Sequence, residues 1–499
     1  MRTVPIGIAM MNDARPHVIA QNEELNMRVL HRWADIIRNG MRNVDGTVPE
    51  VVLGSESIKS VRTAQAVGEQ LRRAGCRIII MCYTVWNFPY LVWPFYNSVG
   101  RDVPVLSLSN NNGQYPGNVG LLATDGALRQ AGVRTHRIVG DIDDVSVHQN
   151  VLDWIRAAEA YATIRNEVYG LYGGASMGMD TGFFHLVPTL KALGCTTEQV
   201  DQLLLTKVME QEVDEAEVES GLRWFERLLG DRIRYDGKML TPETLKTQLR
   251  LYLAMNMVNR EHGFDFCGLK GQRELTEYVC LGDIPEMLLN DPYDWRGPKE
   301  PTVCATEADS YAAITMQLLK YVSGGLPSLF MDVRLYRPEL DLWDWCNSGN
   351  HASYYAEQSM DPEVNFRRIT LHPALEFYFK AGGASVEFNA KAGPMTYARL
   401  GLWDDKPFMA ILKGESVELD PEQARAINAE TDPTWPHVHA RVHAPFEQFL
   451  SLFPANHVHG TVGDQVRALT YLCEMSGIAP VILGPEGKDR QAPIWELVR

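Results

Sequence analysis

Residues 302–336 read TVCATEADSYAAITMQLLKYVSGGLPSLFMDVRLY and predict a strand, a helix and a second strand, in that order. The apolar runs at 303–305 and 328–332 are typical of buried strands, and Glu307 opens the helix between them. Strands that alternate with helices are typical of a parallel sheet covered by helices. These residues therefore predict an α/β fold, with a carboxylate at the end of each of the two strands.

The chain before residue 302 repeats this alternation. In the first third, strands are predicted at 4–10, 50–53, 77–82 and 103–108, and helices at 22–40 and 60–74. A short strand at 169–171 and amphipathic helices at about 196–230 and 241–262 follow. We predict a doubly wound parallel sheet in each of the two segments. In such sheets ligands bind beyond the carboxyl ends of the strands.

The pattern changes toward the C-terminus. From residue 365 onward, short alternating strands and Gly/Pro turns predict a β-rich region, with one helix near 462–476. The length of 499 residues favours about three domains. We predict an N-terminal α/β domain at 1–160, a second α/β domain at 161–328 that carries Glu307, and a β-rich domain at 329–499 that carries His457.

Composition excludes several classes of protein. Hydrophobic residues make up 45% and charged residues 22%, which is ordinary for a globular chain. The net charge of −16 argues against a nucleic-acid partner, and no run of 18 apolar residues predicts a membrane span. The N-terminus is typical of a first strand and not of a signal peptide. Eight scattered cysteines without a CxxC motif indicate reduced thiols, so we expect a cytoplasmic protein.

Glu307 and Asp332 are the first candidates for chemistry. Carboxylates at equivalent ends of neighbouring parallel strands can converge on one point, which suits a hard divalent cation because such ions prefer oxygen ligands. The sequence PANHVHGTVGD at 454–464 adds His457, and a histidine with two carboxylates is a suitable set for Mn²⁺, Fe²⁺ or Co²⁺. The alternatives are a helix cap with a salt bridge to Arg334, and a loop histidine satisfied by its neighbours.

A second candidate lies in TWPHVHARVH at 434–443. Trp435 with the polar side chains of His437, His439 and Arg441 could line a sugar site by ring stacking and hydrogen bonds. The same alternation is equally typical of the exposed face of one strand. Both interpretations stay open at this point.

Eight short blocks resemble the L-fucose isomerase family, which is related more distantly to the L-arabinose isomerases. They are GGASMG (173–178), KGQR (270–273), ATEADS (305–310), FMDVRLY (330–336), NSG (347–349), GESVEL (414–419), DPTWP (432–436) and PANH (454–457). Each block is short, but the ordered set is specific. The resemblance implies two α/β domains followed by a β-rich, barrel-like C-terminal domain, and homo-hexamers with active sites between subunits.

The resemblance also implies site residues. Glu307, Asp332 and His457 would bind Mn²⁺, with Mg²⁺ or Co²⁺ as alternatives. The sugar-binding positions would be Gln272, Ser348, Tyr378, Trp435 and Asn456, with Arg15 and Trp86 reaching the site of a neighbouring subunit. The implied reaction is aldose–ketose isomerisation of a monosaccharide through a cis-enediol(ate), in which Glu307 and Asp332 exchange the roles of acid and base.

Three histidines depart from the family pattern near the expected pocket. His351 follows the NSG block, and His437 and His439 follow DPTWP, where the family carries small or neutral residues. Added histidines would suit a polar or anionic end of the sugar. We therefore predict that all three bind substrate and that the substrate is a 6-modified aldose such as sulfoquinovose. L-fucose or D-arabinose is the alternative substrate. The alternative functions are a non-catalytic sugar-binding protein and a metal-dependent lyase or epimerase.

Overall fold

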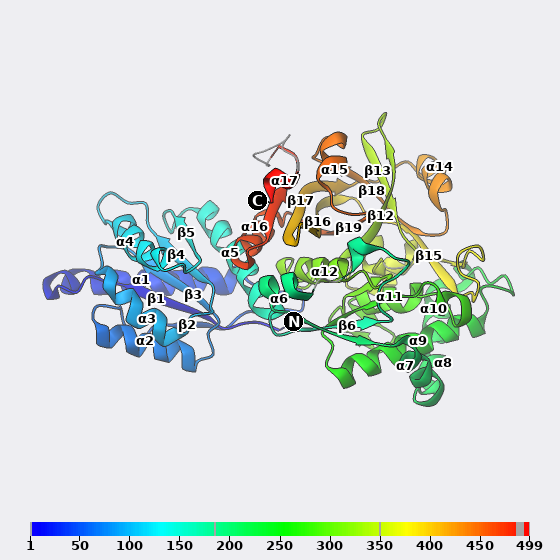
Figure 1. The fold of residues 1–499 in the computed structure, drawn as a ribbon, viewed down its shortest axis with the longest axis horizontal. Helices are drawn as coiled ribbons and strands as arrows, with labels where there is room; N and C mark the ends of the chain where they lie inside the picture. The colour runs from blue at the N-terminus through cyan, green and yellow to red at the C-terminus, as the bar shows by residue number, and fades with distance from the viewer. Residues whose placement is uncertain (1, 184–185, 349–350, 486–493, 499) are drawn as a thin grey trace. The chain divides into compact units, whose positions relative to one another are not determined.

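The computed structural model describes residues 2–183, 186–348, 351–485 and 494–498 (Figure 1). The chain divides into two compact units. Unit 1 consists of Met1–Arg165 and Arg467–Ser476, and unit 2 consists of Asn166–Val466 and Gly477–Arg499. In the described part of the chain, no helix has both the length and the apolar character that a bilayer span requires.

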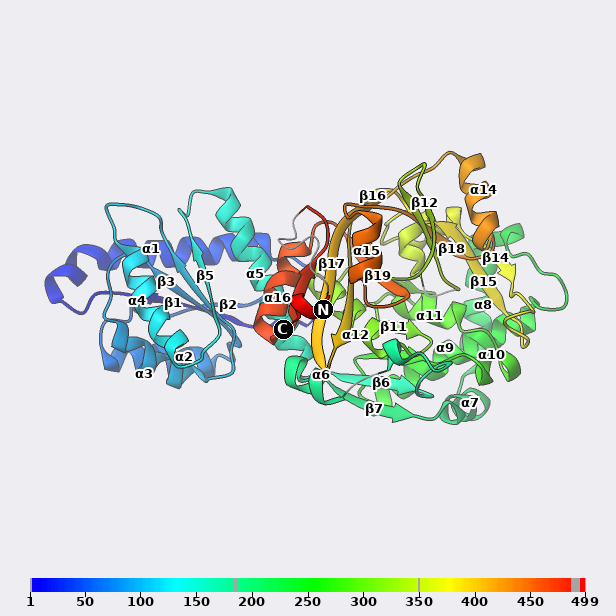
Figure 2. The same cartoon turned by 45° about the horizontal axis from the view of Figure 1, so that its top comes forward.

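Unit 1 contains a five-stranded parallel sheet in the order β2-β1-β3-β4-β5. The strands are β1 (Ile6–Met11), β2 (Val51–Leu53), β3 (Ile78–Tyr83), β4 (Val105–Ser109) and β5 (Thr135–Val139). The helices are α1 (Pro16–Gly40), α2 (Val61–Arg73), α3 (Val92–Val99), α4 (Gly117–Gln130), α5 (Val145–Ile164) and most of α16 (Val466–Ser476). Helices α1 and α5 lie on one face of the sheet, and α2 and α3 lie on the other (Figures 1 and 2). The predicted doubly wound sheet is confirmed.

Unit 2 begins with a second parallel sheet, in the order β11-β8-β6-β7. Its strands are β6 (Val168–Tyr172), β7 (Thr196–Val200), β8 (Phe266–Leu269) and β11 (Cys304–Thr306). The helices of this region are α6 (Leu186–Leu193), α7 (Gln202–Gln211), α8 (Glu215–Leu229), α9 (Pro242–His262), α10 (Glu274–Tyr278), α11 (Asp283–Asn290) and α12 (Ser310–Val322). A short ribbon pairs β9 (Tyr293–Asp294) with β10 (Gly297–Pro298).

The predicted helix at about 196–230 is wrong in part. Its first residues form strand β7, and the rest forms two helices because aspartates interrupt the segment. The Asp201 side chain accepts a hydrogen bond from the backbone N–H of Leu203 and begins α7. The Asp214 side chain accepts one from Ala216 and begins α8. Aspartate is a preferred N-cap residue, and here its local hydrogen bonds outweigh the continuous helical spacing.

The second sheet of unit 2 has nine strands, in the order β14-β15-β18-β13-β12-β19-β16-β17-β20. These strands are β12 (Leu329–Arg337), β13 (Leu342–Cys346), β14 (Thr370–Pro373), β15 (Ala384–Asn389), β16 (Gly393–Trp403), β17 (Lys406–Ser416), β18 (Pro436–Val442), β19 (His457–Val462) and β20 (Ala479–Ile482). Strand β17 also pairs with β18, which closes six of the strands into a ring. The predicted barrel-like C-terminal region is confirmed. Helices α13 (Pro362–Asn365), α14 (Pro421–Thr431), α15 (Phe446–Leu452) and α17 (Ile494–Leu497) complete the unit.

Helix α12 connects the two sheets of unit 2. Every residue from Ser310 to Val322 is buried, and the helix contacts β8 and β11 of the parallel sheet and β12, β16 and β19 of the larger sheet. A helix buried on all sides is held in place by packing around its whole circumference. It therefore positions Glu307, just before it, and strand β12, just after it. One continuous hydrophobic core extends through both sheets. The division into three domains at residues 160 and 328 stays a prediction.

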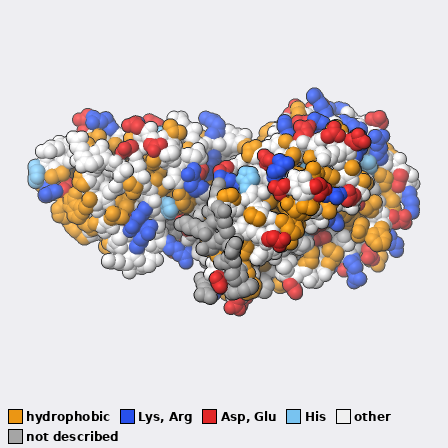
Figure 3. Space-filling view, turned by 90° about the horizontal axis from the view of Figure 1, so that it is seen from above, with side chains coloured by type: hydrophobic (Ala, Val, Ile, Leu, Met, Phe, Trp, Pro, Cys, Tyr) orange, Lys and Arg blue, Asp and Glu red, His pale blue; other side chains and the backbone are white. Residues whose placement is uncertain are grey.

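The surface and the cysteines are ordinary for such a fold. Acidic and basic side chains are interspersed over unit 2 on the face seen in Figure 3. All eight cysteines lie within the described residues and are buried, and none of them forms a disulfide.

Candidate active site

Glu307 lies at a strained turn between β11 and α12. Its φ is +56° and that of Ala308 is +50°, so two successive residues with side chains adopt the left-handed conformation. Each costs on the order of 1 kcal/mol, and such geometry persists only where packing enforces it. Asp309 then accepts a hydrogen bond from the backbone N–H of Ala312 at 2.9 Å and caps α12. The turn directs Glu307 into a cavity while Asp309 stays buried behind it.

Asp332 and His457 face each other on two antiparallel strands. Strands β12 and β19 pair in a register that places these two residues directly opposite. His457 Nε2 lies 3.1 Å from Asp332 Oδ1 and 3.3 Å from Glu307 Oε2. We predicted that Glu307 and Asp332 approach each other because they follow neighbouring parallel strands. They do lie close to the same histidine nitrogen, but the predicted reason is wrong. Glu307 follows a strand of one sheet, Asp332 lies within a strand of the other, and α12 brings the two sheets together.

A buried ion network orients His457. Its Nδ1 lies 2.6 Å from Asp309 Oδ2, which also lies 2.8 Å from an Arg399 guanidinium nitrogen. Burial alone would raise the pKa of Asp309, but Arg399 and His457 outweigh burial and lower it. Burial lowers the pKa of His457, but its hydrogen bond to Asp309 and the nearby carboxylates of Asp332 and Glu307 raise it well above its usual range. Because Nδ1–H donates to a carboxylate, Nε2 is the nitrogen that faces the cavity carboxylates.

Two of the three pairs of donor atoms in this group have the spacing that a divalent cation requires. A histidine that donates Nδ1–H to a carboxylate while Nε2 faces further ligands is the common arrangement of metal-binding histidines. Neighbouring ligand atoms around an octahedral ion with bonds of about 2.1 Å lie about 3 Å apart. The two Nε2–oxygen distances of 3.1 and 3.3 Å match that spacing. One nitrogen and two carboxylate oxygens suit Mn²⁺, Co²⁺ or Mg²⁺.

The cavity beside these residues has a volume of about 250 Å³. Its polar wall contains the carboxylates of Asp283, Glu286, Glu307 and Asp332, the cations Lys270 and Arg334, and the uncharged Gln272, Thr276, Thr306, Asn347 and Ser348. Met177, Leu281, Phe379, Tyr378 and Trp435 form the apolar wall, with Gly271 and Gly282. Aromatic rings beside amides and carboxylates are what a polar molecule of sugar size requires. Four of the predicted sugar-binding residues, Gln272, Ser348, Tyr378 and Trp435, lie on this cavity together with Glu307 and Asp332.

Asn347 and Arg334 hold Asp332 from two sides. Asn347 Nδ2 donates to Asp332 Oδ2 at 3.1 Å, and Arg334 Nε lies 3.5 Å from the same oxygen. The Arg334 guanidinium also lies over the ring of Trp435, 5.0 Å from its centre. Burial raises the pKa of Asp332, but His457, Arg334 and Asn347 together lower it. The carboxylate is therefore held in its charged form. Gly349, which completes the NSG block, lies outside the described residues.

The three departing histidines lie elsewhere, and their predicted place in the pocket is wrong. His351, His437 and His439 are each at most 2% exposed, and none is among the described residues that line the cavity. Burial lowers the pKa of His351 to about 3 and that of His439 to about 4. His437 and His439 lie on β18 opposite Cys346 and Asp344 of β13, so strand pairing directs them into a packed layer. Neither the sugar site nor the exposed strand face predicted for them is present.

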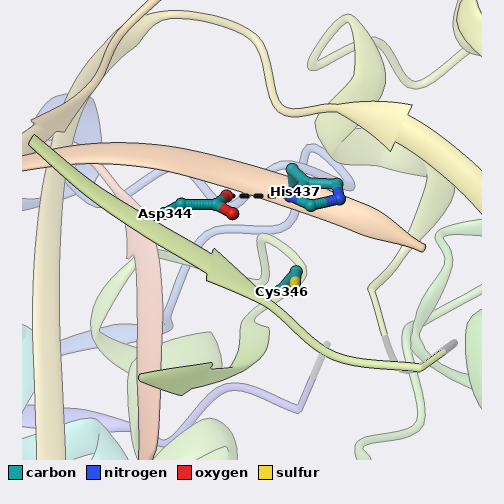
Figure 4. Close-up of side chains that lie close together, drawn as sticks. All are labelled: Asp344, Cys346 and His437. Atoms are coloured by element: carbon teal, nitrogen blue, oxygen red, sulfur yellow. Dashed lines mark hydrogen bonds and ion pairs between the residues drawn. The ribbon is translucent and has the colours of Figure 1, made fainter. Parts of the chain in front are cut away.

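Asp344, Cys346 and His437 form a second group that could hold a metal ion (Figure 4). One donor atom from each lies within 4.8 Å of the others. His437 Nδ1 lies 2.8 Å from Asp344 Oδ1, and its Nε2 lies 2.7 Å from the backbone oxygen of Asp432. Thr431 donates to the other Asp344 oxygen at 2.8 Å, and burial raises the pKa of the Cys346 thiol to about 12. Hydrogen bonds already occupy both histidine nitrogens and both aspartate oxygens, so these two residues form a packed polar network.

The remaining predicted residues lie outside the cavity wall. Asn456 has an exposed side chain, and its backbone oxygen accepts a hydrogen bond from Val333 at 2.9 Å. Arg15 and Trp86 belong to unit 1, where they follow β1 and β3 at the carboxyl edge of the sheet. The buried carboxylate of Asp13 lies 2.7 Å from the half-exposed Arg15 guanidinium. A role for these residues at a neighbouring subunit's site stays a prediction.

Sequence reasoning missed two acids of the cavity. Asp283 and Glu286 are each 2% exposed, and both lie on the first turn of α11. Burial raises the pKa of Asp283 to about 7 and that of Glu286 well above its usual value. The stretch that could have indicated these acids is DIPEMLLN at 283–290, in which two acids lie three positions apart at the start of an otherwise apolar helix. Acidic residues are also common at helix N-termini for structural reasons, so this pattern alone does not indicate a cavity.

The fold and the cavity define an α/β protein with a closed barrel and a cavity suited to a small polar molecule. Comparison with known families makes this specific. Residues 3–166 match the first N-terminal domain of L-fucose isomerase, residues 262–324 the second N-terminal domain, and residues 345–483 the C-terminal domain. The chain belongs to the L-fucose isomerase family, as its motifs predicted.

Several relatives are similar over most of their length. The L-fucose isomerase of Bacteroides thetaiotaomicron is 28% identical over 86% of this chain and 84% of its own. Those of Vibrio vulnificus and Haemophilus influenzae are 26% and 25% identical over 87% of this chain, covering 84% and 83% of theirs. Membership of this family supports a sugar isomerase of the aldose–ketose type, acting in carbohydrate metabolism.

Proposed function

We propose that the chain interconverts an aldose and its ketose through a cis-enediolate, with Glu307 and Asp332 as the acid–base pair. One observation carries this proposal. A buried histidine nitrogen faces one oxygen of each carboxylate, at 3.3 and 3.1 Å, in the wall of a cavity of sugar size. Isomerisation needs a base that removes the proton from C2 and an acid that returns it to C1. Two carboxylates around one point provide both.

Glu307, Asp332 and His457 would hold a divalent cation, and we propose Mn²⁺, with Mg²⁺ or Co²⁺ as alternatives. The cation would supply positive charge against the negative charge that develops on O1 and O2. Trp435 is 5% exposed and packs with Phe379, so it excludes water from one side of the cavity. Gln272, Ser348 and Tyr378 would orient the sugar by hydrogen bonds.

The cavity has two candidate substrate classes. A neutral 6-deoxy sugar is favoured by the relatives, which are named L-fucose isomerases. A 6-modified anionic aldose such as sulfoquinovose is favoured by Lys270 and Arg334, the two cations on the cavity wall. His351, His437 and His439 do not support an anionic sugar, because they lie outside the cavity. Both cations also lie in blocks that resemble the family, so direct measurement must separate the two classes.

The assembly and the cellular location are further proposals. We infer a homo-hexamer in which Arg15 and Trp86 of one subunit complete the cavity of a neighbour. Sedimentation equilibrium measures the mass, and Arg15→Ala in the assembled protein should raise the KM for the sugar. A cytoplasmic location stays a prediction from the scattered, buried cysteines.

Proton NMR in D₂O tests the proposed reaction. The protein is incubated with L-fucose, D-arabinose or sulfoquinovose, with Mn²⁺ or with EDTA. We expect deuterium at C1 of a ketose, formed with Mn²⁺ and lost with EDTA, and the fastest sugar identifies the substrate class. Sugar binding without exchange would establish the binding-protein alternative instead. An aldose product with inverted C2, or a cleaved carbon–carbon bond, would establish an epimerase or a lyase.

A further inference from the structure

Asp283 is a buried acid that the proposed isomerisation does not use. It is 2% exposed, lies on the wall of the cavity and begins helix α11. The Ser348 hydroxyl donates to its Oδ1 at 2.8 Å. Its buried Oδ2 makes no hydrogen bond of good geometry among the described residues, although the Ser385 hydroxyl interacts with this carboxyl group and lowers its pKa. A buried carboxyl oxygen without a partner is costly, so a bound molecule that supplies one would be stabilised there.

Asp283 and Asp332 each accept a hydrogen bond from one of two consecutive residues. Asn347 and Ser348 are consecutive residues after β13, and each holds one acid of the cavity. Asn347 donates to Asp332 at 3.1 Å, and Ser348 donates to Asp283 at 2.8 Å. Side chains of one short segment therefore hold both acids by hydrogen bonds. A group that acts on O5 must lie close to the isomerisation site, because O5 and O1 are bonded to the same carbon of a pyranose.

The proposed reaction has a step before isomerisation that needs such a group. A free hexose or pentose is mainly a ring, in which C1 carries no carbonyl group. The C2 proton becomes acidic only when the C1–O5 bond has broken and the aldehyde has formed. That opening requires a proton on O5 and removal of the proton from O1, which is bifunctional acid–base catalysis.

We propose that Asp283, with Ser348 as its relay, opens the pyranose ring and so prepares the open-chain aldose, an inference that rests on the proposed isomerase function. The carboxyl O–H at Oδ2 donates its proton to O5 as the C1–O5 bond breaks. The O1–H proton passes to Ser348 Oγ while the Ser348 hydroxyl proton passes to Oδ1. The carboxyl group ends protonated on its other oxygen, so no net proton is gained or lost.

The surroundings keep Asp283 ready as an acid. Burial raises its pKa to about 7, so much of it retains a proton near neutrality. The negative charge of Asp432 also raises the pKa of Asp283.

A comparison of ring and open-chain substrates tests this inference. L-fucose is mainly a pyranose, whereas 2,3-dihydroxypentanal of the same C2 and C3 configuration lacks the hydroxyls that close a ring. We expect Asp283→Asn to lower kcat/KM for L-fucose about 10²-fold more than for the open-chain aldehyde. Ser348→Ala should shift the ratio in the same direction by a smaller factor. Asp420→Asn, an exposed N-cap of α14 that asparagine can also cap, is the matched control and should leave the ratio unchanged.

A second measurement separates this inference from the proposed function. Two-dimensional exchange NMR follows interconversion of the α and β anomers of L-fucose, D-arabinose and sulfoquinovose, which requires ring opening but no isomerisation. We expect the wild-type protein to accelerate exchange of one of these sugars, and Asp283→Asn to lower that acceleration at least tenfold. Accelerated exchange without any ketose would overturn the proposed isomerase and leave the ring-opening role intact. Ketose formation without accelerated exchange would overturn the ring-opening role, as would equal losses on the ring and open-chain substrates. If Asp283→Asn does not fold, Ser348→Ala carries the same comparison.

Discussion

Two buried clusters of unit 2 contain similar residues and differ in what they can do. Glu307 and Asp332 border a cavity, and the Nε2 of the buried His457 faces both carboxylates. Asp344, Cys346 and His437 are packed in a layer, and hydrogen bonds occupy both nitrogens of that histidine and both oxygens of the aspartate. The difference teaches that residue types alone do not make a metal or catalytic site. Donor atoms must also be left free beside a space that a ligand can enter.

The largest expected effect is at the cavity cluster. Glu307→Gln removes both an acid–base group and a metal ligand, so turnover should fall about 10³-fold or more. The measurement is steady-state kinetics on the preferred sugar, with bound metal determined by elemental analysis. Glu447→Gln, at the exposed first turn of α15, is the control and should leave both unchanged. Full activity in Glu307→Gln would exclude it from the acid–base pair.

A substitution in the packed cluster of Asp344, Cys346 and His437 should lower the free energy of unfolding and leave the metal content unchanged. Asp344→Asn leaves His437 facing an uncharged amide, and losing a buried hydrogen bond to a charged group costs about 2 kcal/mol. Urea unfolding followed by fluorescence measures the free energy of unfolding. Metal content should stay at the wild-type level. Loss of metal with unchanged stability would reverse the roles assigned to the two clusters.

Asp309 tests the orientation of His457. Asp309→Asn keeps the N-cap of α12, because asparagine caps as well as aspartate, but it removes the charge between His457 and Arg399. Metal affinity should fall about 10- to 100-fold, as for other residues that orient metal-binding histidines. Titration with Mn²⁺ followed by calorimetry measures it. Unchanged affinity would show that packing alone holds the ring of His457.

The difference in unfolding free energy between the native protein and the Asp344→Asn variant should depend on pH. Burial raises the pKa of Asp344, but its hydrogen bond and charge interaction with His437 outweigh burial and lower it. A lowered carboxyl pKa contributes stability above the unfolded value of about 3.9 and loses it as the pH falls through the folded value. The stability gap between the two proteins should therefore narrow below about pH 4. Unfolding curves at a series of pH values would contradict this if the gap stayed constant.

The smallest expected effect is on the preference between two sugars. Arg334→Gln removes a cation from the cavity wall, so KM for sulfoquinovose should rise several-fold more than KM for L-fucose. Arg441→Gln, which loses a surface ion pair with Glu415, is the matched control. An equal change for the two sugars would indicate that Arg334 acts only through Asp332.

Much of the fold follows from local pattern. The apolar runs at 4–10 and 77–82 are long enough to predict the central strands β1 and β3. The ordered motifs predicted the family and the candidates Glu307, Asp332 and His457. Local pattern failed at 196–230, where two aspartates interrupt a continuous helical spacing.

The site itself depended on contacts between distant residues. Pairing of β12 with β19 sets His457 opposite Asp332, and closure of β17 onto β18 completes the barrel. The same long-range pairing turned His437 and His439 away from the cavity and α11 placed Asp283 in its wall. The sequence by itself determined the strands, the family and the type of chemistry, because these depend on neighbours along the chain. Tertiary structure alone decided which acids and histidines share a cavity, because strand register and packing join residues that local pattern cannot relate.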